Sequence, residues 1–399
     1  MRISTDGERR RRGVALGLAA LVSAAVVLAG CGGSSSSSST SSGGDDSGVK
    51  QAGSGNSAKA KEATEAGTEA GEESGKPIAL EKQTLGLVEI VGAAESIQRE
   101  KSALEAAAAE LGWSVKVCDG EGDPVKMGNC ANTLLSQGVT AMIGANVEVA
   151  PVKAQMETAK ERGIPWINIG GPAKPSPLFS TQAVENETEI GTIMGEYVAE
   201  RMEGEGTVAA SEEPANYPLG VRMDAVYKVL AQDPEIDIVS KHVVDFTDLV
   251  ADVRTWSEGV LTKEPNLGAF ALCVDTDPVA VASVVQSNKG PGKQFPERPL
   301  IVGSLGDLAN LELIRKGQID ATAETALGAT AWIAVDQLAA YFGREAEFAK
   351  DPQDAYSLPI LTPQLVTKEN VPANPKEYAE PPVDFEAFFE TKWETEFKG

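Results

Sequence analysis

The sequence predicts an α/β protein with two lobes, each built on a parallel, doubly wound sheet. Short apolar runs rich in Val, Ile and Leu alternate with amphipathic stretches of helical period, at spacings of about 25 residues. Strands that alternate with helices in this way form parallel sheets with right-handed crossovers. The alternation occurs as two similar series, one after the other, and this repetition predicts two lobes.

The first series contains four predicted strands and three predicted helices. The strands are 84–91, 113–119, 139–145 and 164–171, and the helices are 97–111, 123–138 and 149–162. One face of the first helix carries Ile97, Lys101, Leu104, Ala108 and Leu111. Gly112, Gly138 and Gly163 end the three helices, because glycine readily adopts the left-handed conformation that closes a helix.

The second series is longer and begins with a helix. Its helices are 187–202, 219–231, 247–261, 277–286, 308–316 and 329–342, and its strands are 206–212, 237–244, 267–275, 299–306 and 319–326. Residues 352–399 are rich in proline with scattered aromatics, and we expect this part to lie over the surface.

A basic cluster, Arg9 to Arg12, precedes an apolar stretch of about 15 residues that ends at Leu28. The stretch is short for a membrane span and typical of a secretory signal. Leu28-Ala29-Gly30-Cys31 then resembles the lipobox of bacterial lipoproteins, in which the cysteine is lipidated; an ordinary signal peptide is the alternative. The arginines leave the export route, general secretory or twin-arginine, open.

Residues 32–81 consist mainly of Ser, Gly, Ala, Glu and Lys. Because they contain few large apolar side chains, we expect a disordered tether with a span of about 40 Å. About 318 residues remain for the folded part, which contains no second apolar run of membrane length. The net charge of −24 argues against nucleic-acid binding, which needs basic surfaces.

Four cysteines are present in the chain. Besides Cys31, Cys118 and Cys130 lie close enough in sequence for a disulfide, with two free thiols as the alternative, and Cys273 lies in an apolar run. His242 is the only histidine, so neither a zinc site nor another metal centre is expected.

The ordered segments resemble the type I periplasmic binding proteins, the substrate-binding components of sugar-type ABC importers, similar to ribose-binding protein. The resemblance rests on "LGWSVKVCDGEGDPVKMGNCANTLLSQGVTAMIGANV", "ERGIPWINIGG", "GAFALCVDTDPVAVASVV" and "LELIRKGQIDATAET", and it spans about residues 83–371.

The resemblance implies two Rossmann-like lobes joined by a three-strand hinge. The N-terminal lobe would comprise 82–185 and 325–358, the C-terminal lobe 186–324 and 359–371, and residues 372–399 a tail. The ligand would bind between the lobes, hinge closure would present it to an ABC permease, and no cofactor would be needed. We expect a monomer, lipid-anchored to the outer face of the cytoplasmic membrane.

Three polar features that bind pentoses in relatives, one of them a pair of residues, differ in this chain. Gly170 and Gly171 replace an Asp-Arg pair, Gly220 replaces an arginine, and Leu305 replaces an aspartate. A different ligand or a different set of contacts is therefore implied.

Polar residues at the predicted ends of strands are the candidate ligand contacts. They are Glu89, Asn146, Asn216, Tyr217, Arg222, Asp275 and Glu324. Six of them have a structural alternative: a solvated carboxylate for Glu89, a turn for Asn146, a loop and helix cap for Asn216 and Tyr217, a hinge bond for Glu324 and an ion pair with a neighbour such as Asp224 for Arg222. For the pair Asp275 and Asp277, the helix cap is expected of Asp277 and the ligand contact of Asp275.

The resulting site is rich in carboxylates, which accept hydrogen bonds from hydroxyl groups or pair with ammonium groups. We therefore expect a neutral sugar or polyol first, a cationic or amine-bearing solute second and an anion last. Asp275 and Asp277 do not by themselves make a glycosidase, and no nucleophile motif is present, so an enzyme is not predicted. A receptor that docks a sensor kinase or chemoreceptor remains the alternative to an importer component.

Overall fold

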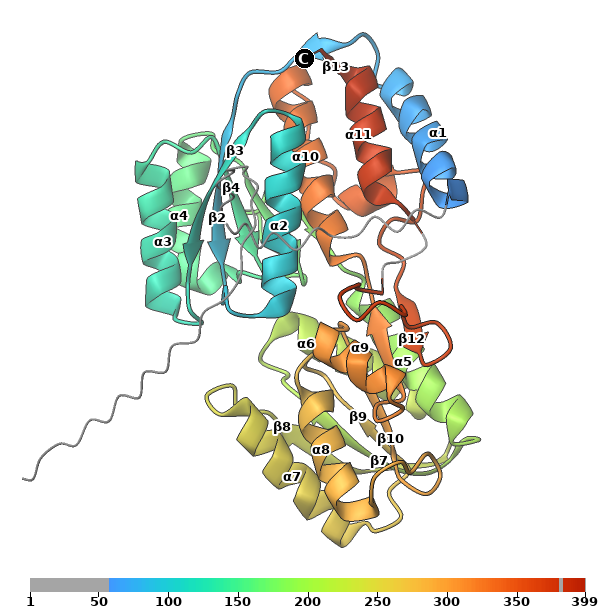
Figure 1. The fold of residues 1–399 in the computed structure, drawn as a ribbon. Helices are drawn as coiled ribbons and strands as arrows, with labels where there is room; N and C mark the ends of the chain where they lie inside the picture. The colour runs from blue at the N-terminus through green and yellow to red at the C-terminus, as the bar shows by residue number, and fades with distance from the viewer. Residues whose placement is uncertain (1–56, 380–382, 399) are drawn as a thin grey trace, which may run out of the picture. The chain divides into compact units, whose positions relative to one another are not determined.

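A five-stranded, fully parallel sheet lies at the centre of the first lobe in the computed structural model, which describes residues 57–379 and 383–398 (Figure 1). The strand order is β3-β2-β4-β5-β6. The strands are β2 (Thr84–Glu89), β3 (Ser114–Asp119), β4 (Ala141–Ala145), β5 (Trp166–Gly170) and β6 (Thr181–Val184). Strands β4 and β5 are buried throughout, as expected for apolar runs covered on both faces.

Four helices cover this sheet (Figure 1). They are α2 (Glu95–Glu110), α3 (Pro124–Ser136), α4 (Val149–Glu161) and α10 (Leu327–Arg344). Helix α2 packs beside α10, although more than 200 residues separate them, and α3 packs beside α4 on the other face. Asp123 caps α3 by accepting a hydrogen bond from the Val125 amide at 2.7 Å.

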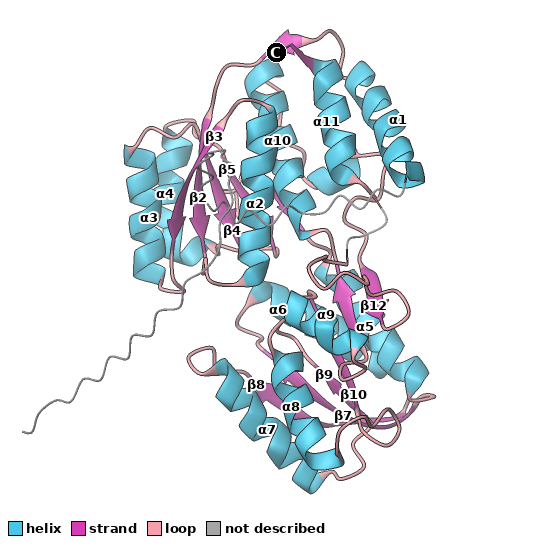
Figure 2. Cartoon of the chain, viewed as in Figure 1, coloured by secondary structure: helices cyan, strands magenta, loops and turns pink. Residues whose placement is uncertain are grey.

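The second lobe contains a six-stranded sheet in the order β12-β11-β10-β9-β7-β8 (Figure 2). Its strands are β7 (Glu205–Glu212), β8 (Glu235–Val243), β9 (Ala269–Ala271), β10 (Leu300–Ser304), β11 (Ala321–Glu324) and β12 (Gln364–Thr367). Strand β12 pairs antiparallel with β11, and the other pairs are parallel. The helices are α5 (Glu187–Arg201), α6 (Tyr217–Leu230), α7 (Leu249–Lys263), α8 (Asp277–Lys289) and α9 (Leu308–Arg315).

The chain passes between the two sheets three times. The first passage lies between β6 and α5, at Glu185 and Asn186. The second lies between β11 and α10, and the third follows a short 3-10 helix, η1 (Pro352–Ala355), on the way to β12. Each lobe is therefore assembled from segments that are distant in sequence.

The prediction of a disordered tether over residues 32–81 was wrong for its second half, which forms regular secondary structure. Residues Ser57–Glu73 form a helix, α1, and strand β1 (Ile78–Ala79) pairs in parallel with β13 (Phe397–Lys398). Helix α1 packs against α11 (Phe385–Glu396), which lies in the region expected to cover the surface as a tail. Residues 32–56 and Cys31 lie outside the described residues.

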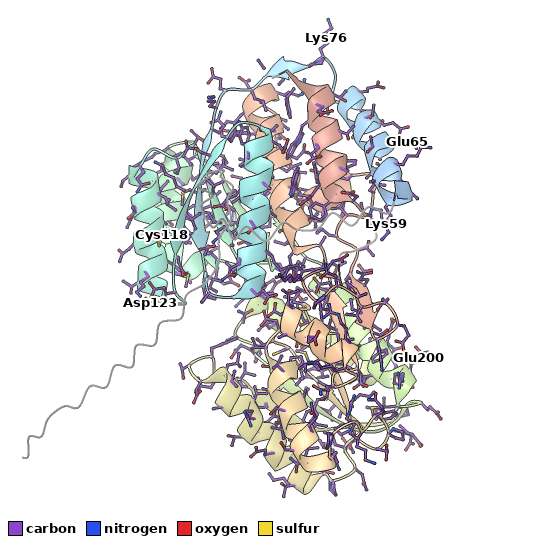
Figure 3. All side chains as sticks on the ribbon, viewed as in Figure 1. Lys59, Glu65, Lys76, Cys118, Asp123 and Glu200 are labelled. Atoms are coloured by element: carbon purple, nitrogen blue, oxygen red, sulfur yellow. A yellow bond between two sulfur atoms is a disulfide. The ribbon has the colours of Figure 1, made fainter. Side chains whose placement is uncertain are left out.

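Small residues let α1 approach α11 closely. Ala63, Gly67 and Gly71 follow one another at four-residue intervals, on one face of the helix. A Cβ atom on Gly67 would lie 2.3 Å from the carbonyl oxygen of Phe388, and one on Gly71 would lie 2.7 Å from that of Lys392. Glu65 projects on the side away from α11 (Figure 3). The contact therefore depends on close backbone packing and not on large apolar side chains.

Helix α11 adds an aromatic cluster to the core of the first lobe. Phe388, Phe389 and Trp393 are buried, and the Trp393 ring stacks on Trp332 of α10 with centroids 5.2 Å apart. The Trp393 indole N–H donates to Asp336 at 2.7 Å. The C-terminal segment therefore belongs to the folded lobe.

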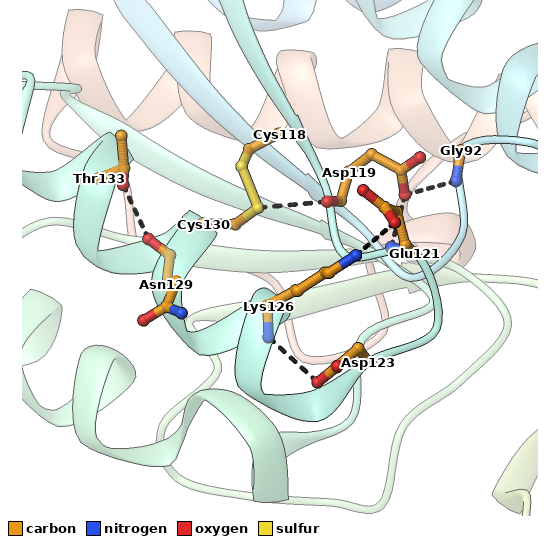
Figure 4. The surroundings of a disulfide bond; sticks show 9 residues. All are labelled: Gly92, Cys118, Asp119, Glu121, Asp123, Lys126, Asn129, Cys130 and Thr133. Carbon is orange, nitrogen blue, oxygen red and sulfur yellow. Dashed lines mark hydrogen bonds and ion pairs between the residues drawn. A yellow bond between two sulfur atoms is a disulfide. The ribbon is translucent and has the colours of Figure 1, made fainter.

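Cys118 at the end of β3 and Cys130 on α3 form a disulfide, with Cα atoms 5.4 Å apart (Figure 4). The bond joins an edge strand to the helix that follows it. Cys273 is a buried free thiol. Within residues 57–379 and 383–398, the helices are too short or too polar to cross a membrane.

Candidate ligand-binding site

A cavity of about 170 Å³ lies where the carboxyl ends of strands from both sheets meet. The first lobe contributes residues that follow β2, β4 and β5, together with Ser96, Ile97 and Glu100 of α2. The second lobe contributes the start of α6 and the residues that follow β9 and β10. Glu185, in the first passage between the sheets, also lines it. Open α/β sheets bind ligands at this position.

Four of the seven candidate ligand contacts line this cavity. They are Asn146, Asn216, Arg222 and Asp275. Glu89, Tyr217 and Glu324 lie outside its lining. The strand-end reasoning therefore located the region, whereas the role of each side chain depends on its contacts.

Asn146 positions a carboxylate that the sequence analysis did not select. Its amide nitrogen donates to both carboxylate oxygens of Glu100, at 3.0 and 3.1 Å. Its backbone has φ +57°, a left-handed conformation that asparagine tolerates better than most residues. Asn146 therefore holds Glu100 against the cavity.

The glycines that replace the Asp-Arg pair of relatives make room for these two side chains. A Cβ atom on Gly170 would lie 2.4 Å from Glu100 Oε1, and one on Gly171 would lie 2.6 Å from Asn146 Oδ1. Gly170 also has φ +77°. Glu100 and Asn146 thus occupy space that a side chain at position 170 or 171 would need.

Arg222 lines the cavity, and its guanidinium forms the kind of ion pair that was the structural alternative to a ligand contact. Its Nε and Nη2 donate to the two carboxylate oxygens of Glu187, at 2.7 and 2.8 Å. Its Nη1 donates to the Cys273 carbonyl at 2.8 Å and to Ser304 Oγ at 2.6 Å. Four donors are therefore used within the second lobe, and the partner is Glu187 instead of Asp224.

Asn216 and Tyr217 mark the start of α6. The Asn216 side chain accepts a hydrogen bond from the Leu219 amide at 3.4 Å, so it caps the helix while it borders the cavity. Tyr217 is half-buried at the first helical position and does not line the cavity.

Asp275 connects the two lobes across the cavity. Ser96 Oγ of α2 donates to its carboxylate at 3.5 Å, and its backbone carbonyl accepts from Asn310. Burial raises the pKa of this carboxyl, and the positive charge of Arg222 opposes that rise. Asp277, two residues later, accepts from Ser211 at 2.7 Å within the second lobe.

Glu324 bonds across the lobes instead of facing the cavity. Arg99 Nη2 donates to its carboxylate at 2.9 Å, and both side chains are buried. The Gly306 amide donates to its other oxygen. Glu89 is likewise buried, with only 3% of its surface exposed, so it is neither a cavity contact nor a solvated carboxylate.

Glu100, Glu185 and Glu187 are the site residues that sequence reasoning missed. Glu100 lies three residues after Ile97 and four before Leu104, on the buried face of α2, where the expected face had Lys101. That spacing in the sequence indicates that Glu100 lies on the buried face of the helix. Glu185 and Glu187 lie at the first passage between sheets, where the sequence shows no strand end.

Burial is the main influence on the ionisation of the missed carboxyl groups. Burial raises the pKa of Glu100 to about 8, although the Asn146 hydrogen bond and the nearby charge of Arg99 oppose the rise. Burial and the carboxylates of Glu187 and Glu100 raise the pKa of Glu185 well above its ordinary value. Across the described ranges, no group of three His, Cys, Asp or Glu side chains is arranged to hold a metal ion.

A family model for the periplasmic binding protein domain matches residues 92–345, well over half of the chain. The chain belongs to this family. Its two sheets and three connecting passages are those of the type I periplasmic binding proteins of ABC transporters, which are not enzymes.

Two curated solute-binding relatives, named for xylitol and for ribose import, share 23% identity with the chain over the aligned residues. The ribose import binding protein RbsB of Bacillus subtilis aligns over 56% of this chain and 69% of its own length. The xylitol-binding protein of Mycolicibacterium smegmatis aligns over 35% of this chain and 43% of its own length, so the match spans less than half of that relative.

Solved structures of ABC transporter solute-binding proteins share the fold. A Burkholderia graminis protein in complex with D-arabinose has a TM-score of 0.64 and 21% identity, covering 75% of this chain and 98% of the other. A Bacillus halodurans protein with bound myo-inositol has a TM-score of 0.62 and 17% identity, covering 72% and 96%.

Proposed function

We propose that this periplasmic binding protein captures a small sugar- or polyol-like solute between its lobes and delivers it to an ABC permease. The observation that carries the proposal is the cavity lined by both lobes and by Glu185 at a passage between them. A solute bound there contacts both lobes at once, so it stabilises the closed arrangement over the open one.

The chemistry of the lining suits a small polar solute. Carboxylates and amides provide acceptors for hydroxyl groups, and apolar side chains such as Ile97 and Leu219 cover the carbon faces of a sugar ring. A cavity of about 170 Å³ is small beside the roughly 300–1,000 Å³ of drug-sized sites, which favours a single monosaccharide or polyol. The relatives named for xylitol and ribose support the same class.

Hydrogen bonds and an ion pair beside the cavity join the two lobes and would stabilise the closed state. Arg99 on α2 reaches Glu324 of the second lobe, and Glu95 Oε1 accepts from the Leu308 amide at 2.9 Å and from the Tyr378 hydroxyl at 2.8 Å. The Arg99 guanidinium also lies over the Tyr378 ring, 4.0 Å from its centroid. Opening would break these contacts, and solute binding would favour their formation.

Calorimetric titration of the purified full-length chain with ribose, arabinose, xylitol and myo-inositol tests solute capture. Native mass spectrometry before and after mild denaturation adds a search for solute retained from the cell. A bound sugar- or polyol-like solute is the expected result. If none of these compounds binds and no solute is retained, the proposed function is contradicted.

The lipid anchor forms part of the proposal, with Cys31 as its site. A lipidated Cys31 and the segment that follows would keep the domain near its permease at the outer face of the cytoplasmic membrane. Labelling of expressing cells with an alkyne fatty acid should mark the wild-type chain and not Cys31→Ser. Equal labelling of the two chains would contradict the anchor.

A further inference from the structure

The cavity lining carries more carboxylates than cations. Among the lining residues that the structure describes, the carboxylates belong to Glu100, Glu148, Glu185, Glu187 and Asp275, and the one cation is Arg222. Arg222 is paired with Glu187 at both carboxylate oxygens, so these two charges offset each other. Glu100, Glu185 and Asp275 therefore line the cavity without an arginine or lysine bonded to them.

Glu185 shows most directly that the described lining of the cavity leaves a carboxylate short of hydrogen-bond donors and positive charge. It has 4% of its surface exposed, and its Oε1 atom has no hydrogen-bond partner among the residues that the structure describes. The charges of Glu187, Glu100 and Glu324 raise the pKa of Glu185 further, while the positive charge of Arg222 opposes that rise. A buried carboxylate oxygen without a donor is costly, so a donor from the solute would relieve that cost.

Glu100 is a second carboxylate held in place for the solute. Asn146 donates to both of its oxygens and fixes its orientation, but an amide supplies no positive charge. The absence of a side chain at Gly170 keeps this position available to Glu100. Each carboxylate oxygen can accept more than one hydrogen bond, so Glu100 retains acceptor capacity toward the cavity.

We propose that the solute carries a protonated amine beside its hydroxyl groups, and that Glu185 and Glu100 receive that amine. The inference rests on the proposed solute-binding function and narrows its substrate class to amino sugars or amino polyols. Burial raises the pKa of both carboxyl groups in the solute-free protein, and an ammonium group beside them would favour their charged form. It supplies three donors and a positive charge, whereas a hydroxyl supplies one donor and no charge. Charge-assisted hydrogen bonds exceed neutral ones by about 1.4 kcal/mol, which corresponds to about a tenfold difference in affinity.

Matched pairs of probes test this inference in calorimetric titrations of the full-length chain. The pairs are D-glucosamine with D-glucose, D-galactosamine with D-galactose, and 1-amino-1-deoxy-D-sorbitol with D-sorbitol. In at least one pair the amine should bind about tenfold more tightly. Native mass spectrometry of the wild-type chain provides an independent measurement, because a solute retained from the cell should contain a basic nitrogen.

Glu185→Gln has nearly the same shape but cannot become charged beside an amine, so it should reduce the preference for the amine about tenfold. Glu105→Gln is the matched control, since it makes the same change in residue type at an exposed position of α2 outside the cavity lining, and it should keep the preference. Equal thermal unfolding of the variants shows that the fold is intact.

The outcomes separate this inference from the function on which it rests. Three results would each contradict the proposed amine and leave solute binding in place. They are a neutral member that binds as tightly as its amine in every pair, a retained neutral solute, and an unchanged preference in Glu185→Gln. A chain that binds no probe and retains no solute overturns both.

Discussion

Two buried arginine–glutamate pairs in this protein use the same chemistry in different positions. Arg222 and Glu187 both belong to the second lobe, where they join α6 to the start of α5. Arg99 and Glu324 belong to different sheets, and their bond spans the lobes. On the opening that the proposed function requires, the first pair would stay buried within its lobe, whereas the second would become exposed to water. A buried ion pair can thus stabilise either a fold or one conformation of it.

Removal of Arg222 should have the largest effect. Arg222→Met leaves Glu187 buried and unpaired, and loss of one partner of a buried pair costs about 3–5 kcal/mol. Denaturant unfolding of the full-length chain measures this loss. The double variant Arg222→Met/Glu187→Leu should recover much of it, because no buried charge remains. A single variant as stable as wild type would show that the pair does not support the lobe.

The carboxylates without an arginine partner predict a pH effect. Glu100 has an ordinary pKa near 4.5 when the chain is unfolded and a pKa of about 8 when it is folded. Between these values the folded protein holds a proton that the unfolded chain has lost. Stability should therefore fall as pH rises through this window, by up to about 1.4 kcal/mol per unit.

Unfolding of the solute-free chain from pH 5 to pH 8.5 measures this slope, and Glu100→Gln should flatten it and stabilise the protein at pH 8. Asp277, whose pKa burial raises to about 7, adds a slope of the same sign that remains in the variant. A slope that is identical in Glu100→Gln and wild type would exclude Glu100 as its source.

Arg99→Met should destabilise the closed form relative to the open form more than it destabilises the folded protein. Glu324 can become hydrated when the lobes separate, so the expected cost is a shift of about 1.4 kcal/mol toward the open form, seen as about tenfold weaker solute binding. Small-angle scattering should show a larger radius for the solute-free variant. Arg298→Met is the matched control, because Arg298 and Asp320 form a buried pair within the second lobe. The control should lower stability and leave affinity unchanged; the opposite pattern would refute the distinction between the pairs.

Gly67→Leu tests a contact that uses no charge and should have the smallest effect on global stability, about 1 kcal/mol. The new side chain would meet the Phe388 carbonyl, so α1 should separate from α11. Amide hydrogen exchange of residues 58–73 should accelerate while exchange in β4 stays slow. Glu65→Leu, on the exposed side of α1, is the control and should leave exchange in both segments unchanged. Protection of α1 in Gly67→Leu would show that the glycine is not required.

The alternation of apolar runs and amphipathic stretches predicted most of the fold, because buried parallel strands and their covering helices have distinct periods. It missed α1 because a stripe of Ala63, Gly67 and Gly71 carries almost no apolar signal. It also treated α11 as part of a surface tail, although its aromatic residues pack on Trp332. In both cases the partner helix is distant in sequence.

For the candidate site, strand ends identified Asn146, Asn216 and Asp275 as cavity residues, since strand carboxyl ends meet at one edge of a sheet. The resemblance to relatives, and not a strand end, indicated Arg222, and it did so without its partner. Glu187 lies 35 residues earlier, and the sequence does not show that the two side chains meet.

The sequence by itself determined two α/β lobes, a family and the region of the candidate site, because these depend on local periods and on the order of elements. Only the tertiary structure decided which charges are neutralised and which remain. Arg222 is paired within a lobe, Arg99 is paired across the lobes, and Glu185 is left without a donor on one oxygen. The physical reason is that pairing depends on distances of a few ångströms between segments that only folding brings together.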